Sequence, residues 1–313
     1  MPCCSPSGSS SRRRGPSPAS RVRCAERVLR LGRHTFPDDR LLVMAIVNRT
    51  RDSFYDNGAT YAEDAALERV RAVVADGAEI VDIGGVKAGP GDVVDVTEEL
   101  QRTVGFVARV RDEFPDIVIS VDTWRSEVGR AVCEAGADLL NDAWGGHDPG
   151  LVEVAAEHGA AYICTHTNGA TPRQPPHRVS YADVVRAAID DTVALANRAL
   201  AAGVARESLL IDPAHDFEKT TWHSLEITRR LDEMVGTGWP VLVSLSNKDF
   251  VGETLDLPTS ERLTGTLAAT AIAAWHGARV YRVHEVRETR QVLDMVASIQ
   301  GIRPPARTTR ALA

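Results

Sequence analysis

The 313-residue sequence is poor in cysteine, has few aromatic residues and lacks a long apolar run, and these shortages exclude several classes of protein. No apolar run approaches the roughly 20 residues that a membrane-spanning helix needs, and no charged-then-apolar leader resembles a secretory signal. The cysteines are too few and too irregularly spaced for a disulfide framework or a zinc site. They are Cys3, Cys4, Cys24, Cys133 and Cys164. We therefore expect no membrane partner and a reducing, cytoplasmic location.

Charge is distributed unevenly along the chain, whose formal net charge is -7. The first 34 residues hold eight arginines and one glutamate, a net +7, so the rest of the chain carries -14. This segment is rich in serine, proline and arginine and cannot bury enough apolar surface to offset its ordering entropy. Residues 1–34 are therefore predicted to be a disordered tail. An acidic body with no basic stripe or aromatic platform argues against nucleic-acid binding.

The body alternates short apolar runs with longer amphipathic stretches, which is typical of α/β proteins. The short runs, predicted as strands buried on both faces, cover 41–47, 79–83, 117–121, 138–140, 160–164, 208–211, 241–244 and 279–283. The amphipathic stretches, predicted as helices, cover 62–76, 96–113, 125–135, 149–158, 181–202, 260–276 and 288–299.

Eight strands, most of them followed by a helical stretch, within about 270 residues predict a (β/α)8 TIM barrel. We expect a single barrel domain over residues 35–303, followed by a C-terminal tail at 304–313. A doubly wound open sheet is the alternative. It is disfavoured because no Gly-x-Gly-x-x-Gly motif follows the first strand.

In a TIM barrel the active site lies at the carboxyl ends of the strands, so the residues that follow each run are the first candidates for function. Polar or ionisable residues stand at every such position. The ones that we single out are Asn48, Asp122, Asn141, Asp212, Lys248, Arg282 and His284. Each alone has an ordinary structural explanation, since an aspartate after a strand commonly caps a helix. Independent caps do not explain a whole ring of such residues, which indicates a binding site.

Several motifs between residues 41 and 299 resemble those of the dihydropteroate synthase family. The first, Asn48 to Gly58, is similar to the family's Asn-Val-Thr-Pro-Asp-Ser-Phe-Ser-Asp-Gly-Gly. The others are Asp82-Ile83-Gly84-Gly85, Ser120-Val121-Asp122-Thr123, Asn141-Asp142, Asp212-Pro213, Phe250-Val251-Gly252 and Arg282-Val283-His284-Glu285-Val286. Their common order and spacing make the resemblance specific.

This resemblance implies a function and a role for each of the singled-out residues. Members of the family join a dihydropterin diphosphate to p-aminobenzoate and release diphosphate. Cations and a metal ion would neutralise the charge of the leaving group as the C–O bond breaks. The match to the family motifs assigns the pterin to Asp122, Asn141, Asp212 and Lys248, the diphosphate to Arg282 and His284, and an accompanying Mg²⁺ to Asn48. It also implies a homodimer formed through the C-terminal helices and p-aminobenzoate analogues as further ligands.

The loops that would carry the chemistry depart from the family pattern. The family's second loop reads Gly-Gly-Glu-Ser-Thr-Arg-Pro-Gly, and residues 84–91 lack the Ser-Thr-Arg, which removes a diphosphate-binding guanidinium. The family's Ser-Arg-Lys has become Ser246-Asn247-Lys248, and its Asp-Pro-Gly-Ile-Gly-Phe-Gly-Lys has gained the carboxylates of Asp216 and Glu218. A like charge about 6 Å from the bound anion costs roughly 3 kcal/mol at an effective dielectric near 20.

We therefore predict a homologue with a retained pterin pocket but eroded diphosphate and p-aminobenzoate loops. It lacks efficient synthase activity and acts as a binding or regulatory protein. One alternative is an active or weakly active transferase, with a relocated anion site built from Arg49, Arg51 and Lys87. Another is a relative of the pterin-binding methyltransferases, which share the barrel and the Asp/Asn pocket. The lysine, arginine and histidine at the last two strand ends match the synthase family better.

Overall fold

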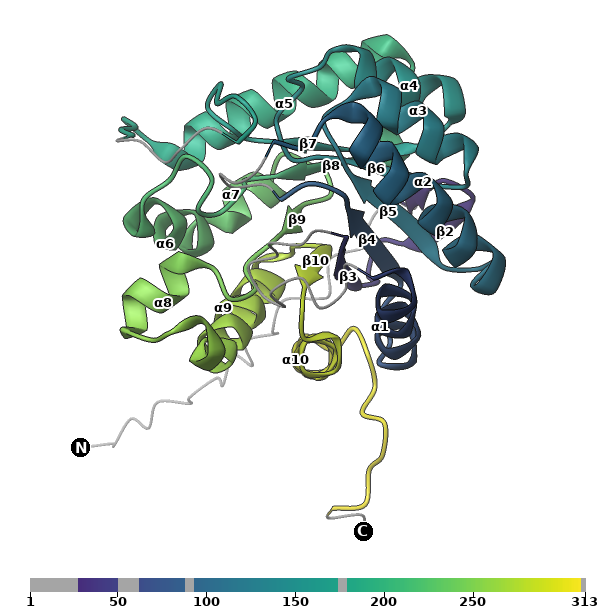
Figure 1. The fold of residues 1–313 in the computed structure, drawn as a ribbon. Helices are drawn as coiled ribbons and strands as arrows, with labels where there is room; N and C mark the ends of the chain where they lie inside the picture. Colours follow the sequence, from purple (N-terminus) through teal and green to yellow (C-terminus); the bar gives the residue numbers. More distant parts are fainter. Residues whose placement is uncertain (1–27, 50–61, 88–92, 174–178, 311–313) are drawn as a thin grey trace, which may run out of the picture.

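A closed parallel barrel forms the centre of the computed structural model, which describes residues 28–49, 62–87, 93–173 and 179–310. Neighbouring strands follow the order β8-β7-β6-β5-β4-β3-β10-β9 (Figure 1). They are β3 Leu42–Asn48, β4 Ile80–Gly84, β5 Val118–Asp122, β6 Leu139–Asp142, β7 Ala161–Thr165, β8 Leu209–Asp212, β9 Leu242–Val243 and β10 Val280–Val283. A parallel bridge between Ile211 and Val241 joins the two ends of this sheet. The predicted TIM barrel is confirmed, and the doubly wound alternative is wrong.

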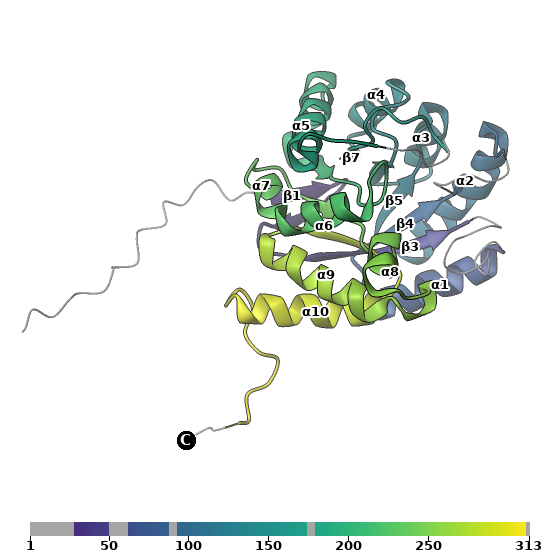
Figure 2. The same ribbon diagram turned by 90° about the vertical axis from the view of Figure 1, so that its left-hand side faces the viewer.

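Helices surround the barrel, as the two views of the ribbon show (Figures 1 and 2). Those predicted from the sequence are α1 Glu63–Ala75, α2 Val96–Glu113, α3 Ser126–Glu134, α4 Gly150–His158, α5 Val184–Ala202, α9 Leu263–His276 and α10 Val286–Ile299. Three short helices were not predicted: α6 Thr221–Arg229, α7 Leu231–Val235 and α8 Asp249–Leu255. They follow β8 and β9, and their brevity leaves little apolar periodicity to read.

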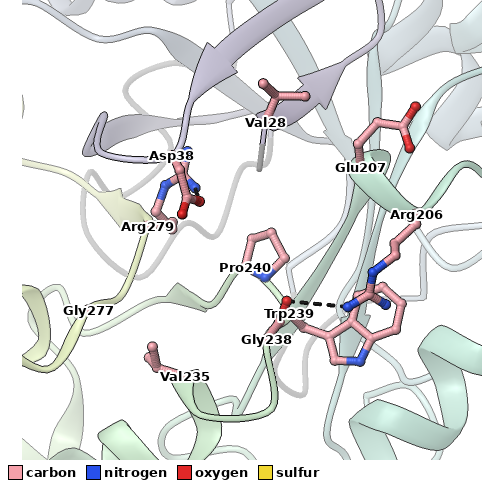
Figure 3. A pocket seen from close by; sticks show the side chains of 10 residues that line it. All are labelled: Val28, Asp38, Arg206, Glu207, Val235, Gly238, Trp239, Pro240, Gly277 and Arg279. Atoms are coloured by element: carbon pink, nitrogen blue, oxygen red, sulfur yellow. Dashed lines mark hydrogen bonds and ion pairs between the residues drawn. The ribbon is translucent and has the colours of Figure 1, made fainter. Parts of the chain in front are cut away.

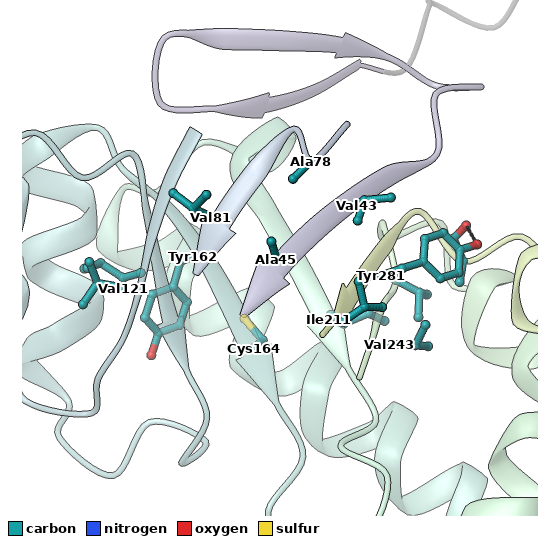
Figure 4. Close-up of a cluster of buried hydrophobic side chains, with 14 of the residues drawn as sticks. Val43, Ala45, Ala78, Val81, Val121, Tyr162, Cys164, Ile211, Val243 and Tyr281 are labelled. Atoms are coloured by element: carbon teal, nitrogen blue, oxygen red, sulfur yellow. Dashed lines mark hydrogen bonds between the residues drawn. The ribbon is translucent and has the colours of Figure 1, made fainter. Parts of the chain in front are cut away.

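Two layers of apolar side chains hold the barrel together, because residues alternate between its inside and its outside along each strand. Outward-facing residues such as Val43, Ala45 and Val81 pack in the layer beneath the helices (Figure 4). Inward-facing residues of the amino-terminal half fill the interior: Leu42, Met44, Ile80, Val118, Leu139, Ala161, Ile163, Leu210, Leu242 and Val280. Further along the strands the inward positions become polar, and the candidate site begins there.

A hairpin closes the amino-terminal end of the barrel and corrects the predicted domain boundary. Its strands are β1 Val28–Leu31 and β2 His34–Pro37, which pair antiparallel. Leu29 and Leu31 are fully buried in the interior cluster because apolar and polar residues alternate along β1. The turn needs a glycine at Gly32, where φ is +56° and a Cβ atom would lie 2.6 Å from Asp138 Oδ1. The tail predicted for residues 1–34 therefore extends too far, because β1 begins at Val28.

The two ends of the chain complete this account. Residues 1–27, which hold most of the predicted tail, lie outside the described residues. After α10, residues 304–310 are exposed and form no helix or strand. Across the described ranges we find no helix with the length and apolarity that spanning a membrane requires.

Candidate functional site

The polar residues predicted from the strand ends meet inside the barrel, directly above its apolar layer. The strand register places Asn48 of β3, Gly84 of β4, Asp122 of β5 and Asn141 of β6 in one row. Asp212 ends β8 further round the barrel. Asn141 and Asp212 are 4% and 6% exposed, so their polar groups lie within the protein rather than on its surface. The geometry thus unites the residues that the sequence assigned to the pterin.

Arg282, which was predicted to hold the diphosphate, is paired with two carboxylates in this interior. Its Nε lies 2.6 Å from Asp82 Oδ2, and its Nη2 lies 3.0 Å from Asp122 Oδ2. One guanidinium is therefore shared between the fully buried Asp82 and the partly buried Asp122. Burial raises the pKa of Asp122 to about 7, and the attraction of Arg282 opposes this shift. Asp82 was not predicted as a site residue, although a charged residue within an apolar strand signals a buried partner.

Asp212 and Lys248 form the other charged side of the site. Asp212 Oδ1 accepts a hydrogen bond from the Ala214 N–H at 2.7 Å. Lys248 Nζ donates to the His215 carbonyl and lies 4.9 Å from the centroid of the Phe217 ring. Burial raises the pKa of Asp212 and lowers the pKa of Lys248, while their mutual attraction opposes both shifts. The two groups therefore depend on each other for their charged states.

A second lysine lies close by and was not singled out in the sequence. Lys219 is 9% exposed, and its Nζ donates to the Phe217 carbonyl at 2.8 Å. Burial, helped by the neighbouring charge of Lys248, lowers the pKa of Lys219 to about 7. The sequence did offer a signal for Lys219, because it ends the segment after β8 in which three family glycines are replaced by other residues.

The loop after β8 keeps a backbone that normally requires glycine. Ala214, Asp216 and Glu218 have φ values of +53°, +68° and +50°, and they stand at the three glycines of the family motif. A left-handed conformation costs an L-residue roughly 1–2 kcal/mol. Since all three residues adopt it, the loop conformation is determined by its surroundings rather than by local preference.

Asp216 shows what those surroundings are. Its Oδ2 accepts the Phe250 N–H at the start of α8 at 3.1 Å, and its Oδ1 accepts the Ser224 hydroxyl of α6 at 2.9 Å. The carboxylate thus ties two helices to the loop. The repulsion that we expected Asp216 to exert on a bound anion is smaller than that of an unbonded carboxylate, because these donors partly offset its charge.

His284 is enclosed in a hydrogen-bonded group at the ends of β9 and β10. Its Nδ1 lies 2.9 Å from Ser246 Oγ, and that hydroxyl donates to Glu285 Oε2 at 3.1 Å. Asn247, which replaces the family's arginine, donates from Nδ2 to Glu285 Oε1 at 2.9 Å. The Ser246 hydroxyl therefore links His284, which was predicted to bind diphosphate, to the carboxylate of Glu285.

The first two loops are described only in part, and Arg51 and residues 88–91 lie outside the described residues. Gly85 must be glycine, because a Cβ atom there would lie 2.8 Å from Thr103 Cγ2 of α2. Arg49 follows an inward-facing residue and so turns outward. Its Nε donates to the Arg102 carbonyl at 3.3 Å, and its guanidinium carbon lies 5.0 Å from the Phe106 centroid. Arg49 also lines a cavity of about 630 Å³ with Arg102 and three carboxylates, Glu63, Asp95 and Glu98, and the relocated anion site stays a prediction.

An aromatic row that sequence reasoning missed lines the loops after β5, β6 and β8. The ring centroids of Trp124 and Trp144 are 6.3 Å apart, and those of Trp144 and Phe217 are 5.8 Å apart. Both tryptophans come two residues after a strand that ends in a site motif, which was the available signal. The neighbouring rings meet edge to face, at interplanar angles of 79° and 73°, so they pack against one another rather than forming one flat surface.

No group of three or more His, Cys, Asp or Glu side chains within the described ranges is arranged to hold a metal ion. The predicted ligand Asn48 contributes a carboxamide at the end of β3, and its Oδ1 would lie 3.6 Å from a Cβ atom on Gly84. Asp122, the next residue in that row with a carboxylate, is paired with Arg282. These residues fit a magnesium ion only as one protein contact to a metal held mainly by ligand oxygens and water.

A separate cavity of about 430 Å³ lies at the opposite, amino-terminal end of the barrel (Figure 3). It is lined by Val28 of the hairpin, Asp38 directly after the hairpin, the Gly238-to-Pro240 loop before β9, and Arg279. Arg206 lies over the Trp239 ring at 3.9 Å from the centroid. None of the predicted site residues borders this cavity, so it is distinct from the polar interior.

Comparison with known proteins agrees with this geometry. Residues 44–284 match the family model described as pterin binding enzyme. The chain is 60% identical to a Mycobacterium leprae protein named inactive dihydropteroate synthase 2, over 88% of this chain and 96% of that one. A Yersinia pestis dihydropteroate synthase in a sulfonamide drug complex is 33% identical with a TM-score of 0.83, covering 88% of this chain and all of that one.

A Thermus thermophilus dihydropteroate synthase in complex with 4-aminobenzoate is 35% identical with a TM-score of 0.78, covering 87% of this chain and 100% of that one. The likeness therefore extends over the whole barrel and includes the strand ends that carry the polar residues. The chain belongs to the dihydropteroate synthase family of pterin-binding enzymes.

Proposed function

We propose that this protein binds a pterin within its barrel and lacks efficient dihydropteroate synthase activity. The loss of cations from the loops carries the proposal, since residues 84–91 lack the family's Ser-Thr-Arg and Asn247 stands where the family has an arginine. Arg282, which the family motif shares, is paired with Asp82 and Asp122 and does not replace the lost charge. Stabilising a departing diphosphate requires positive charge in excess. The site gains none from Asn247, whose amide binds Glu285. A neutral pterin needs no such excess, because its N–H groups can donate hydrogen bonds to carboxylates and its polar edge can also bind amides.

The comparisons support both parts of the proposal. The Mycobacterium leprae relative is named as an inactive synthase and is 60% identical to this chain, whereas the two solved relatives named as dihydropteroate synthase are 33% and 35% identical. The family description itself is pterin binding. The solved relatives that hold 4-aminobenzoate or a sulfonamide drug make p-aminobenzoate analogues the second class of ligand to test.

Calorimetry on the purified protein, with pterin, dihydropterin diphosphate and p-aminobenzoate titrated separately, tests the proposal. We expect pterin to bind, the diphosphate group to add little affinity, and an assay with both substrates and magnesium to yield no dihydropteroate. Turnover comparable to that of an active family member would refute the claim of inactivity. Failure of every pterin to bind would refute the claim of a retained pocket.

Restoring the second loop separates binding from chemistry. The triple change Lys87→Ser, Ala88→Thr and Gly89→Arg returns the family's Ser-Thr-Arg at the corresponding positions. We expect tighter binding of the dihydropterin diphosphate without full synthase activity, because Asn247 and the added carboxylates of Asp216 and Glu218 remain as they are. Full activity from the triple change alone would show that the second loop is the whole cause of the loss.

Magnesium, compartment and partners belong to the same proposal. We propose that Mg²⁺ binds only together with a diphosphate ligand, with Asn48 as its protein contact. A cytoplasmic location is supported by the free thiols of Cys133 and Cys164 among the described residues. We propose no nucleic-acid partner, since the negative charge of the body repels phosphates.

We further propose a homodimer formed through α9 and α10. Both helices carry large apolar side chains that are about half exposed or more, namely Ile272, Trp275, Met295 and Ile299, and Ile302 follows them. Such a patch favours association. In sedimentation analysis, Met295→Lys combined with Trp275→Glu should shift the protein to a monomer. Trp222→Glu, at an exposed tryptophan of α6, is the matched control and should leave the mass unchanged.

A further inference from the structure

We propose that Asp82 is a positioning residue that makes the pocket selective for 2-amino over 2-oxo pteridines by fixing the orientation of the Asn141 amide. This inference rests on the proposed function, because it concerns which pteridine the barrel accepts. Asp82 lies in the middle of β4, two residues before Gly84 and therefore on the same inward face. It is 0% exposed, so a ligand at the strand ends meets it only through the residues above it.

Asp82 is the acceptor on which three side chains of the interior converge. Ser120 Oγ donates to its Oδ1 at 2.6 Å, and Arg282 Nε donates to its Oδ2 at 2.6 Å. Asn141 Nδ2 lies 3.4 and 3.3 Å from Oδ1 and Oδ2, respectively. The Asp82 carboxylate is thus held in place from two sides while it faces the Asn141 amide.

The orientation of the Asn141 amide follows from this contact. A carboxylate paired with a guanidinium accepts hydrogen bonds and donates none, so the amide must turn its NH₂ group toward Asp82. The opposite orientation would place the amide oxygen against the carboxylate, with two acceptors in contact and no proton between them. Asn141 Oδ1, at the other end of the planar amide, then becomes the group that a ligand meets.

An acceptor at this place discriminates between heterocycles of the same size. In the proposed pose the 2-position of the heterocycle faces Asn141 Oδ1, where a 2-aminopteridin-4-one such as pterin offers N–H donors and binds the amide oxygen directly. A 2,4-dioxopteridine offers a carbonyl oxygen at the same position and leaves both acceptors unsatisfied. Buried sites reject such mismatches strongly, because the desolvation of the unpaired groups is not repaid.

The test exchanges the hydrogen-bonding character of the two residues without changing their size. In Asp82→Asn, Arg282 binds the new amide oxygen, so the new NH₂ group faces Asn141 and turns Asn141 Oδ1 toward it. The wild type should prefer pterin over 2,4-dioxopteridine in calorimetry, and Asp82→Asn should reduce that preference at least tenfold. The double variant Asp82→Asn/Asn141→Asp restores an acceptor toward the ligand and should recover the preference.

Asp38→Asn, the same chemical change at the far end of the barrel, is the matched control and should leave the preference unchanged. A merely structural role of Asp82 would lower both affinities together, and the double variant would not recover the ratio. A ratio that stays constant in Asp82→Asn overturns the inference but leaves pterin binding intact. A wild type that binds neither compound overturns the proposed function, and the inference with it. Should Asp82→Asn fail to fold, the isosteric double variant remains as the test. It should keep the wild-type preference for pterin over 2,4-dioxopteridine, and loss of that preference would overturn the inference.

Discussion

The interior of the barrel and the loops at its carboxyl end differ in how they have changed relative to the family. Inside, Asp82, Asp122, Asn141 and Arg282 match the family motifs and bind one another. In the loops, Asp216 replaces a family residue and has turned its side chain to neighbouring helices. The difference teaches that buried polar groups constrain each other, because losing one leaves another unpaired. A loop residue can change wherever a nearby donor or acceptor receives the new side chain.

The largest expected effect breaks the interior network. Arg282→Met leaves Asp82 and Asp122 buried without a cation, which should lower the free energy of unfolding by about 3–5 kcal/mol. Urea denaturation followed by circular dichroism measures this change. Arg287→Met is the control, since the side chain of Arg287 is 67% exposed in its ion pair with Asp76 and such pairs contribute about 0–1 kcal/mol. Equal effects of the two changes would contradict the contrast between interior and surface.

The next effect concerns ligand affinity. Asp212→Ala removes a buried charged acceptor from the predicted pterin site, so pterin binding should weaken by about 1.5–3 kcal/mol, or roughly 10- to 150-fold. Calorimetry gives the affinity, and thermal unfolding checks that the variant is folded. Asp38→Ala alters the cavity at the opposite end and should leave pterin affinity unchanged. If Asp38→Ala weakened binding instead, the ligand would occupy the far cavity.

A pH titration tests the interior through Asp122. Its pKa is about 7 in the folded protein and near 3.8 without burial, so the folded state binds more protons than the unfolded state between these values. The contribution of this group to stability therefore falls as the pH rises through that window. We expect the unfolding free energy of the wild type, relative to Asp122→Asn, to decrease from about pH 4 to about pH 7. A relative stability that increases over this range would contradict the shift.

The smallest effect tests the loop after β8. Glu218→Ala and Glu218→Gly both delete the side chain, but only glycine adopts the left-handed φ of +50° without cost. The glycine variant should therefore be more stable than the alanine variant by roughly 0.5–1 kcal/mol after its greater unfolded entropy is counted. Thermal unfolding of the pair measures the difference. If alanine proved the more stable, the loop would have relaxed to another conformation.

Much of the fold and the outline of the site could be predicted from the sequence. Strands buried on both faces give continuous apolar runs, and barrel geometry places the residue after each run at one end. This is why Asn48, Asp122, Asn141 and Asp212 could be assigned to a common face before the structure was known. Their register in the sheet confirms that they share this end of the barrel.

What could not be predicted depends on contacts between distant segments. The interior role of Asp82 requires Arg282, which lies 200 residues away. Asp216 accepts a hydrogen bond from the Phe250 N–H at the start of α8, which lies 34 residues further along the chain. The residues next to Asp216 in the sequence therefore do not reveal this contact. The first strand of the hairpin was assigned to the tail because it has only four residues and lies next to a segment of low complexity. Short elements whose stability comes from packing leave a weak local signal.

The hairpin that seals the amino-terminal end has a consequence for exchange between the interior and bulk water. With Leu29 and Leu31 seated beneath the carboxylates, solutes reach Asp82 and its neighbours only past the strand carboxyl ends. For the pterin that we propose, the route in and out therefore passes the strand carboxyl ends, where Asp216, Glu218 and Asn247 depart from the family motifs. A substitution in the loops there can then change the dissociation rate of a ligand without changing the contacts that the interior residues make with it.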